Sequence, residues 1–120
     1  MFHHLARESA NLLIGTNKNA RSNEAWRQVY RSLDHRPTKQ KCENKEMMRR
    51  FPKPIADFAN LFVTMQIKRH TADYDPFANI AKSIVMNDIW LVSQAIEDFA
   101  GAATKDRRAF CVYVLLKERT

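Results

Sequence analysis

Glycine and proline are scarce in this chain, with two and four copies in 120 residues. Turn-rich β-sheets need these residues at their turns, whereas the interiors of helices are weakened by them. Hydrophobic residues make up 45% of the chain, so a domain of this length can bury one core. The sequence therefore predicts a single all-α domain over residues 1–120, built as a small up-and-down bundle of four to five helices.

Apolar spacing and helix-stop signals predict where the helices lie. Ser22 or Asn23 is expected to cap the second helix, which Pro37 interrupts, and a short helix or turn follows through Cys42. Lys45–Pro54 is expected to be the main loop. The other predicted helices cover about Phe2–Ile14, Pro54–Arg69, Ser83–Ala100 and Thr104–Leu116, the last capped by Thr104.

Two of these segments have an apolar pattern that needs interpretation. The run Phe110–Leu116 contains residues that favour strands, but no second strand is predicted to pair with it, so it is interpreted as a buried helix. In the helix that Gly101 terminates, the side chains expected to face inward are Ile89, Leu91, Val92, Ala95, Ile96 and Phe99.

Arg69 continues an apolar stripe on the third of the long helices. Phe58, Phe62 and Met65 are spaced by four and three residues, and Arg69 follows Met65 by four. An arginine on an apolar face is costly unless a carboxylate, a phosphate or a partner surface satisfies it. Asp73 or Asp75 would satisfy Arg69 within the chain, and a phosphate would satisfy it from outside.

The run Gln66–Pro76 reads Gln-Ile-Lys-Arg-His-Thr-Ala-Asp-Tyr-Asp-Pro and resembles the signature turn of HEPN domains, which are helical bundles associated with RNA and nucleotides. In nuclease-type members a histidine follows the arginine by five residues, whereas here that place holds Tyr74 and His70 follows Arg69 directly. The resemblance therefore supports a HEPN-like fold better than RNA cleavage. It covers most of the chain, because the blocks that resemble one HEPN subgroup are Leu5–Gly15, Tyr30–Cys42, Phe58–Pro76 and Asp106–Leu116.

The charge balance makes a polyanion a plausible partner. Twenty lysines and arginines against thirteen acidic residues give a net charge of +7. Arg27, Arg31 and His35 follow one another at intervals of four, so they are expected to share a helix face. The candidate residues for binding RNA or a nucleotide are Lys68, Arg69, His70, Asp73, Tyr74, Arg27, Arg31, His35 and Lys39.

Other ligands and locations are less favoured by the sequence. The histidines and cysteines lack metal-binding spacing, and two glycines cannot build a phosphate loop, so no metal or cofactor is expected. Two distant cysteines suggest a reducing cytoplasm, and no apolar run reaches membrane-spanning length.

The apolar start Met1–Leu5 has no capping residue before it. We therefore expect a homodimer in which a second copy covers this segment, or a chain that lacks the upstream helix of its HEPN relatives.

Three functions remain open at this point. The first is RNA or nucleotide binding, without ribonuclease activity, in a bacterial defence or toxin–antitoxin-like module. Here the resemblance implies a nucleotidyltransferase as partner protein, and a dimer with Arg69 and His70 near the groove between protomers. The second is a metal-independent endoribonuclease in which Arg69 stabilises the phosphate and His70 transfers protons. The third is a module that only binds another protein.

Overall fold

The computed structural model describes residues 1–74 and 81–117, and these residues form an all-α bundle without strands. The all-α prediction is confirmed, although the described residues form seven helices instead of four to five. The helices are α1 (Phe2–Leu13), α2 (Asn23–Ser32), α3 (His35–Cys42), α4 (Lys45–Met48), α5 (Lys53–Tyr74), α6 (Lys82–Ala100) and α7 (Thr104–Leu115).

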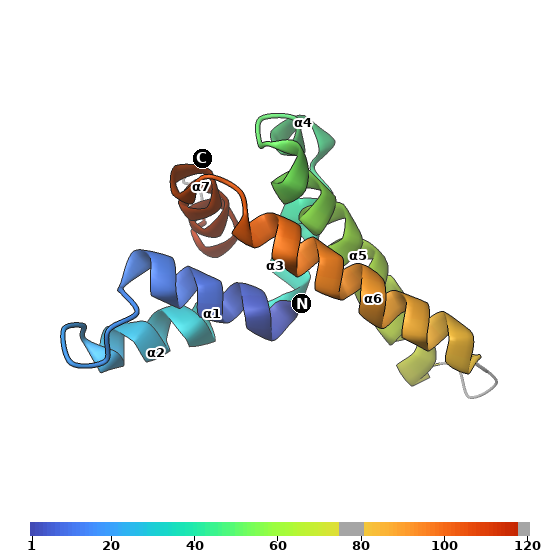
Figure 1. The fold of residues 1–120 in the computed structure, drawn as a ribbon, viewed down its shortest axis with the longest axis horizontal. Coiled ribbons are helices and arrows are strands. Elements are labelled where there is room, and N and C mark those ends of the chain that lie inside the picture. Colours follow the sequence, from blue (N-terminus) through green and yellow to red (C-terminus); the bar gives the residue numbers. More distant parts are fainter. Residues whose placement is uncertain (75–80, 118–120) are drawn as a thin grey trace.

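Two helix pairs set the shape of the molecule (Figure 1). The long helices α5 and α6 run side by side in opposite directions and extend away from the rest of the bundle. At the other end, α1 pairs with α2, and α7 packs against α1 and α3. The start of α1 lies near the middle of the molecule, where α3 also lies (Figure 1). This arrangement brings the first residues of the chain close to the α5–α6 pair.

Phenylalanine rings from α5, α6 and α7 form the centre of the core. Phe58, Phe99 and Phe110 are fully buried, and the ring centroid of Phe99 lies 4.7 Å from that of Phe58 and 5.9 Å from that of Phe110. Phe62 is also buried, so the apolar stripe predicted for α5 is confirmed up to this residue. Replacing such a buried ring by alanine typically costs about 3–5 kcal/mol.

The start of α1 belongs to the same core. Met1 precedes the helix and forms no side-chain capping hydrogen bond, as the sequence predicts. Leu5 is nevertheless fully buried, and Phe2 packs partly buried against the core of its own chain. The chain itself therefore covers Leu5, whereas Met1 and Phe2 stay partly exposed, and the expectation that a second copy covers this segment stays a prediction.

The extra helices arise where the sequence suggested longer elements or loops. The side chain of Ser22 accepts a hydrogen bond from the Ala25 amide at 3.2 Å, so the predicted cap of α2 is confirmed. However, α2 ends at Ser32 in an extended backbone, and Pro37 lies in the first turn of α3, where a missing amide proton costs little. A single turn, α4, forms inside the predicted loop and is capped by the Asn44 side chain.

The last two helices differ from the predictions in their details. Gly101 ends α6, and α7 is a helix through the ambiguous run, as predicted. Ala103, not Thr104, occupies the capping position of α7, and no side chain caps it there. Ile89 is 57% exposed, so its predicted inward orientation is wrong. The other inward residues of α6 are partly buried, and Phe99 is fully buried.

Candidate functional site

Arg69 lies on α5, five residues before the helix ends. Its side chain is 67% exposed, and its Nε atom lies 3.8 Å from the Oδ2 atom of Asp73. The predicted ion pair with Asp73 is thus present, and Arg69 lines the same groove as Phe62 and Met65, so it continues the predicted apolar stripe, although its side chain is exposed. Exposed pairs of this kind contribute only about 0–1 kcal/mol, so the Asp73 carboxylate holds Arg69 weakly. The guanidinium therefore keeps donors free for an anionic ligand.

His35 lies on α3, not on α2 as predicted, and contacts Gln66 of α5. Because the chain turns at Leu33 and Asp34, His35 opens α3 and does not share a face of α2 with the arginines. The Gln66 amide group donates a hydrogen bond to its Nδ1 atom at 2.8 Å, and the Phe2 ring stacks on its ring with centroids 3.7 Å apart. These contacts fix the imidazole at the junction of α1, α3 and α5.

Electrostatics connect His35 with Arg69. Burial lowers the pKa of His35 below its ordinary value of 6.5, and the positive charge of Arg69 lowers it further. The nearby His3 acts in the same direction, while the carboxylate of Asp34 opposes it. His35 is therefore mostly neutral at pH 7 in the free protein. His35 and Arg69 are 34 positions apart in the sequence, and the fold brings them near each other.

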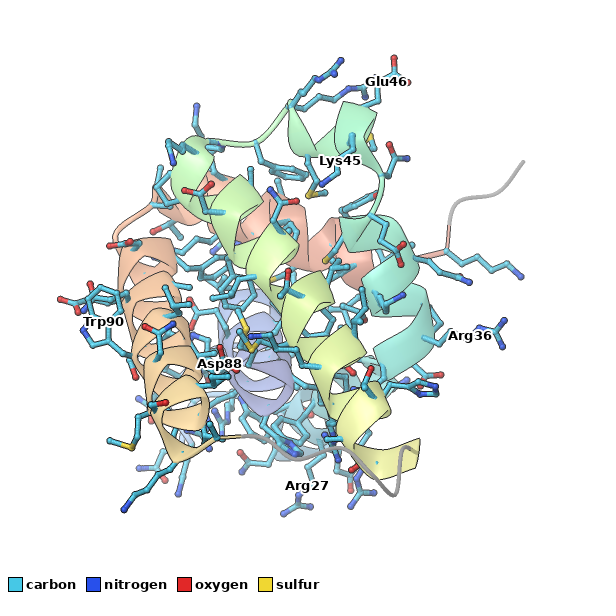
Figure 2. The ribbon with its side chains drawn as sticks, turned by 90° about the vertical axis from the view of Figure 1, so that its right-hand side faces the viewer. Arg27, Arg36, Lys45, Glu46, Asp88 and Trp90 are labelled. Carbon is cyan, nitrogen blue, oxygen red and sulfur yellow. The ribbon has the colours of Figure 1, made fainter. Side chains whose placement is uncertain are left out.

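Arg27 and Arg31 form a separate cationic surface on α2. Together with Glu24, Gln28 and Ser32 they line a shallow hollow of about 520 Å³. Both arginines are exposed, and within the described part of the chain neither forms an ion pair or a side-chain hydrogen bond. Figure 2 shows Arg27 pointing away from the bundle. The predicted shared face of Arg27 and Arg31 is confirmed.

The inner side of α2 explains why these arginines point outward. The indole Nε1 of Trp26 donates to the Oδ1 atom of Asn11 at 3.0 Å, and the Tyr30 ring stacks on Trp26 with centroids 5.4 Å apart. The Tyr30 hydroxyl in turn pairs with Nδ1 of His3 at 3.1 Å. These contacts fasten α2 to α1 through its aromatic side and leave the opposite side to solvent.

The two lysines of the predicted site already have protein partners. The ammonium group of Lys68 donates to both carboxylate oxygens of Asp88, at 2.9 and 3.1 Å, and so connects α5 with α6. Lys39 forms an ion pair with Glu43 at 2.9 Å, one turn further along the chain. These lysines are therefore less available to a ligand than Arg27, Arg31 and Arg69.

The remaining predicted residues lie near the end of α5. His70 and Asp73 are exposed, and His70 leaves the helix about 100° away from Arg69 because the two residues are consecutive. The backbone of Tyr74 ends α5, but its side chain lies outside the described part of the structure. Asp75, the other carboxylate predicted to pair with Arg69, also lies outside the described residues.

An apolar groove that the sequence did not predict lies beside Arg69. It has a volume of about 590 Å³ and lies between α5, the first half of α6 and the start of α1. Its apolar lining includes Phe2, Phe62, Met65, Ile84, Val85, Ile89 and Val92, and its polar lining includes His3, Gln66, Lys68, Arg69 and Asp88. The density of apolar residues between Ile84 and Val92 was the signal that could have revealed it.

Two further observations bear on the class of site. Within residues 1–74 and 81–117, no group of three or more His, Cys, Asp or Glu residues is placed to hold a metal ion. None of the helices described there combines the length and the apolar character that crossing a membrane requires.

Comparison of the chain with protein-family models, with curated proteins and with solved structures finds no match.

Proposed function

We propose that this chain is an RNA- or nucleotide-binding domain that resembles HEPN domains and belongs to a bacterial defence or toxin–antitoxin-like module. One observation carries the proposal: the exposed Arg69 guanidinium, held only weakly by Asp73, lies within electrostatic reach of His35. An arginine fork beside an imidazole suits a phosphate group, because the guanidinium donates charge-assisted hydrogen bonds to it and the Nε2–H group of the imidazole can donate another. Arg27 and Arg31 on α2 add two exposed cations for a longer strand.

The site is better suited to binding than to cleavage. Metal-independent cleavage needs a proton-transfer group aligned with the cation that stabilises the phosphate. His70 leaves α5 in a different direction from Arg69, as consecutive helix residues must. We therefore propose that the chain itself has no ribonuclease activity. In such modules a small nucleotidyltransferase is the partner protein that the HEPN resemblance implies.

RNA binding is tested by fluorescence anisotropy with a labelled single-stranded RNA at increasing salt. Affinity should fall with salt, because each phosphate contact releases counterions and adds about 0.7 to the slope for a single strand. We expect Arg69→Gln to lower the affinity about tenfold, the effect of losing one charge-assisted contact. The double variant Arg27→Gln/Arg31→Gln should reduce the slope by about 1.4.

Lys53→Gln is the matched control for Arg69→Gln. Lys53 lies on the same helix and also pairs with a carboxylate four residues further on, Asp57, but it lies at the opposite end of α5. Its removal should leave the affinity and the slope unchanged. An absence of binding at low salt would contradict the proposal and favour a module that binds only protein. Cleavage of the RNA that disappears in both Arg69→Ala and His70→Ala would instead favour the endoribonuclease.

A further inference from the structure

The first half of α6 has more apolar surface than its own chain covers. Its five exposed large apolar residues are Ile84 (50%), Val85 (41%), Met86 (58%), Ile89 (57%) and Trp90 (59%). Ile67 of α5, which also lines the groove, is 51% exposed. These six residues are called the α6 apolar face below. A helix that is apolar on most of its sides is normally buried on most of its sides.

The exposed apolar residues lie on more than one side of α6, so a ligand in the groove between α5 and α6 could cover only some of them. Ile84, Val85 and Ile89 line the groove between α5 and α6. Met86 and Trp90 do not line it, and Figure 2 shows Trp90 on the outer side of α6, whereas Asp88 faces α5. A small molecule in the groove would leave Met86 and Trp90 in water, so a protein surface is the better occupant.

The size of the face fits a protein–protein contact. At about half exposure, the six side chains together present on the order of 600 Å² to solvent, close to the ~800 Å² that each partner buries in a standard interface. Exposed apolar patches larger than a few hundred Å² are uncommon on monomers and usually mark an interaction site. Residues at the edge of the face would supply the remaining area.

The charges around the face favour a second copy of the same chain. Between Ile84 and Val92 the only charged residue is Asp88, and Lys68 neutralises it through two hydrogen bonds. Two copies that each carry a net charge of +7 repel each other least where they meet through such a neutral surface. Homodimer interfaces are also the most apolar class of protein contact, as this face requires.

We propose that the α6 apolar face is the interface of a homodimer in which the same face of two copies meets about a two-fold axis. Each copy presents a ridge, formed by Met86 and Trp90, next to a groove lined by Ile84, Val85 and Ile89. A face with both a ridge and a groove can be complementary to itself, as a two-fold contact demands. This interface is argued from the exposed apolar residues and not from the proposed RNA binding. It uses none of the α2 arginines, but Arg69 lines the same groove.

Light scattering after size-exclusion chromatography tests the proposal. The unmodified chain should elute at micromolar concentration with twice its 14.0 kDa mass. Ile89→Glu places a charge in the middle of the face and should raise the dissociation constant at least about a hundredfold, the effect of losing an interface hot spot. Because Ile89 is exposed in the single chain, this variant should keep the helical circular dichroism of the parent.

Val112→Glu is the control, since Val112 is an apolar residue of α7 that is 36% exposed but lies outside the α6 apolar face. It should leave the dimer intact. A second measurement uses oxidative cross-linking of Met86→Cys, which should give covalent dimers, with Glu24→Cys on α2 as its control. The native Cys42 and Cys111 are buried and should not react. A monomeric parent chain, a dimer that survives Ile89→Glu, or equal cross-linking of both cysteine variants would overturn the proposal.

Discussion

Arg69 and His35 influence each other although they belong to different helices. Arg69 is held by one carboxylate at 3.8 Å, and its charge reaches the imidazole that Gln66 and Phe2 hold in place. Because the positive charge disfavours the protonated imidazole, His35 stays neutral until an anion arrives. A bound phosphate would reverse this influence, since its negative charge favours the protonated form.

Removing the charge of Arg69 should therefore raise the pKa of His35. We expect this in Arg69→Gln, where burial alone still keeps the pKa below 6.5 because burial is the largest cause of the shift. A pH titration of the His35 ring by NMR measures the change. Arg31→Gln serves as the control, since Arg31 is not one of the charges that act on His35. An identical titration in the parent and in Arg69→Gln would show that the two side chains are not coupled.

At the scale of helices, Lys41 fastens the end of α7. Its ammonium group donates to the backbone oxygen of Tyr113 at 2.7 Å and also to that of Leu116. The Tyr113 hydroxyl donates back to the Lys41 backbone oxygen at 2.9 Å. A cation at the C-terminal end of a helix satisfies carbonyl groups that have no partner within the helix and interacts favourably with the helix dipole.

We expect Lys41→Met to lower the free energy of unfolding by about 1–3 kcal/mol, the range for losing hydrogen bonds from a charged group. Urea denaturation followed by circular dichroism measures this change. Lys39→Met, on the same helix, is the control, because Lys39 forms only an exposed pair with Glu43 that is worth about 0–1 kcal/mol. Equal losses in the two variants would show that Lys41 acts as an ordinary surface lysine.

Helix positions could be predicted where the apolar spacing selects one face. Phe58 and Phe62 repeat at four residues on α5, and both are buried. On α6 the apolar residues surround most of the helix, so periodicity could not show that Ile89 faces outward. The meeting of His35 with Arg69 could not be predicted either. It depends on the chain turning at Leu33, which separates His35 from α2, and on α3 packing against α5.

For the whole molecule, two histidines make stability depend on pH. Burial lowers the pKa of His4 below 6.5, with the N-terminal amine and Arg7 acting in the same direction and Glu8 opposing it. Among the described residues, its buried Nε2 atom has no hydrogen-bond partner. His35 is shifted in the same direction. In the unfolded chain both residues titrate near 6.5, so the unfolded state takes up protons first as the pH falls.

The free energy of unfolding should therefore decrease as the pH falls below 6.5 and level off below the lowered pKa values of the folded state. Thermal unfolding between pH 7.5 and pH 5.5 measures this, within a range above the usual carboxylate pKa of about 4. The double variant His4→Gln/His35→Gln should show a smaller decrease than the parent. If the two proteins lose the same stability over this range, other groups cause the dependence.

The pairing of α1 with α7 also affects how the protein is made. Arg107 of α7 forms its ion pair with Glu8 of α1, and these residues are 99 positions apart in the chain. A ribosome adds roughly 5–20 residues per second, so α7 is synthesised several seconds after α1. During that interval the face of α1 that packs on α7 has no cover. Until α7 has been synthesised, the nascent chain therefore presents an uncovered apolar face of α1.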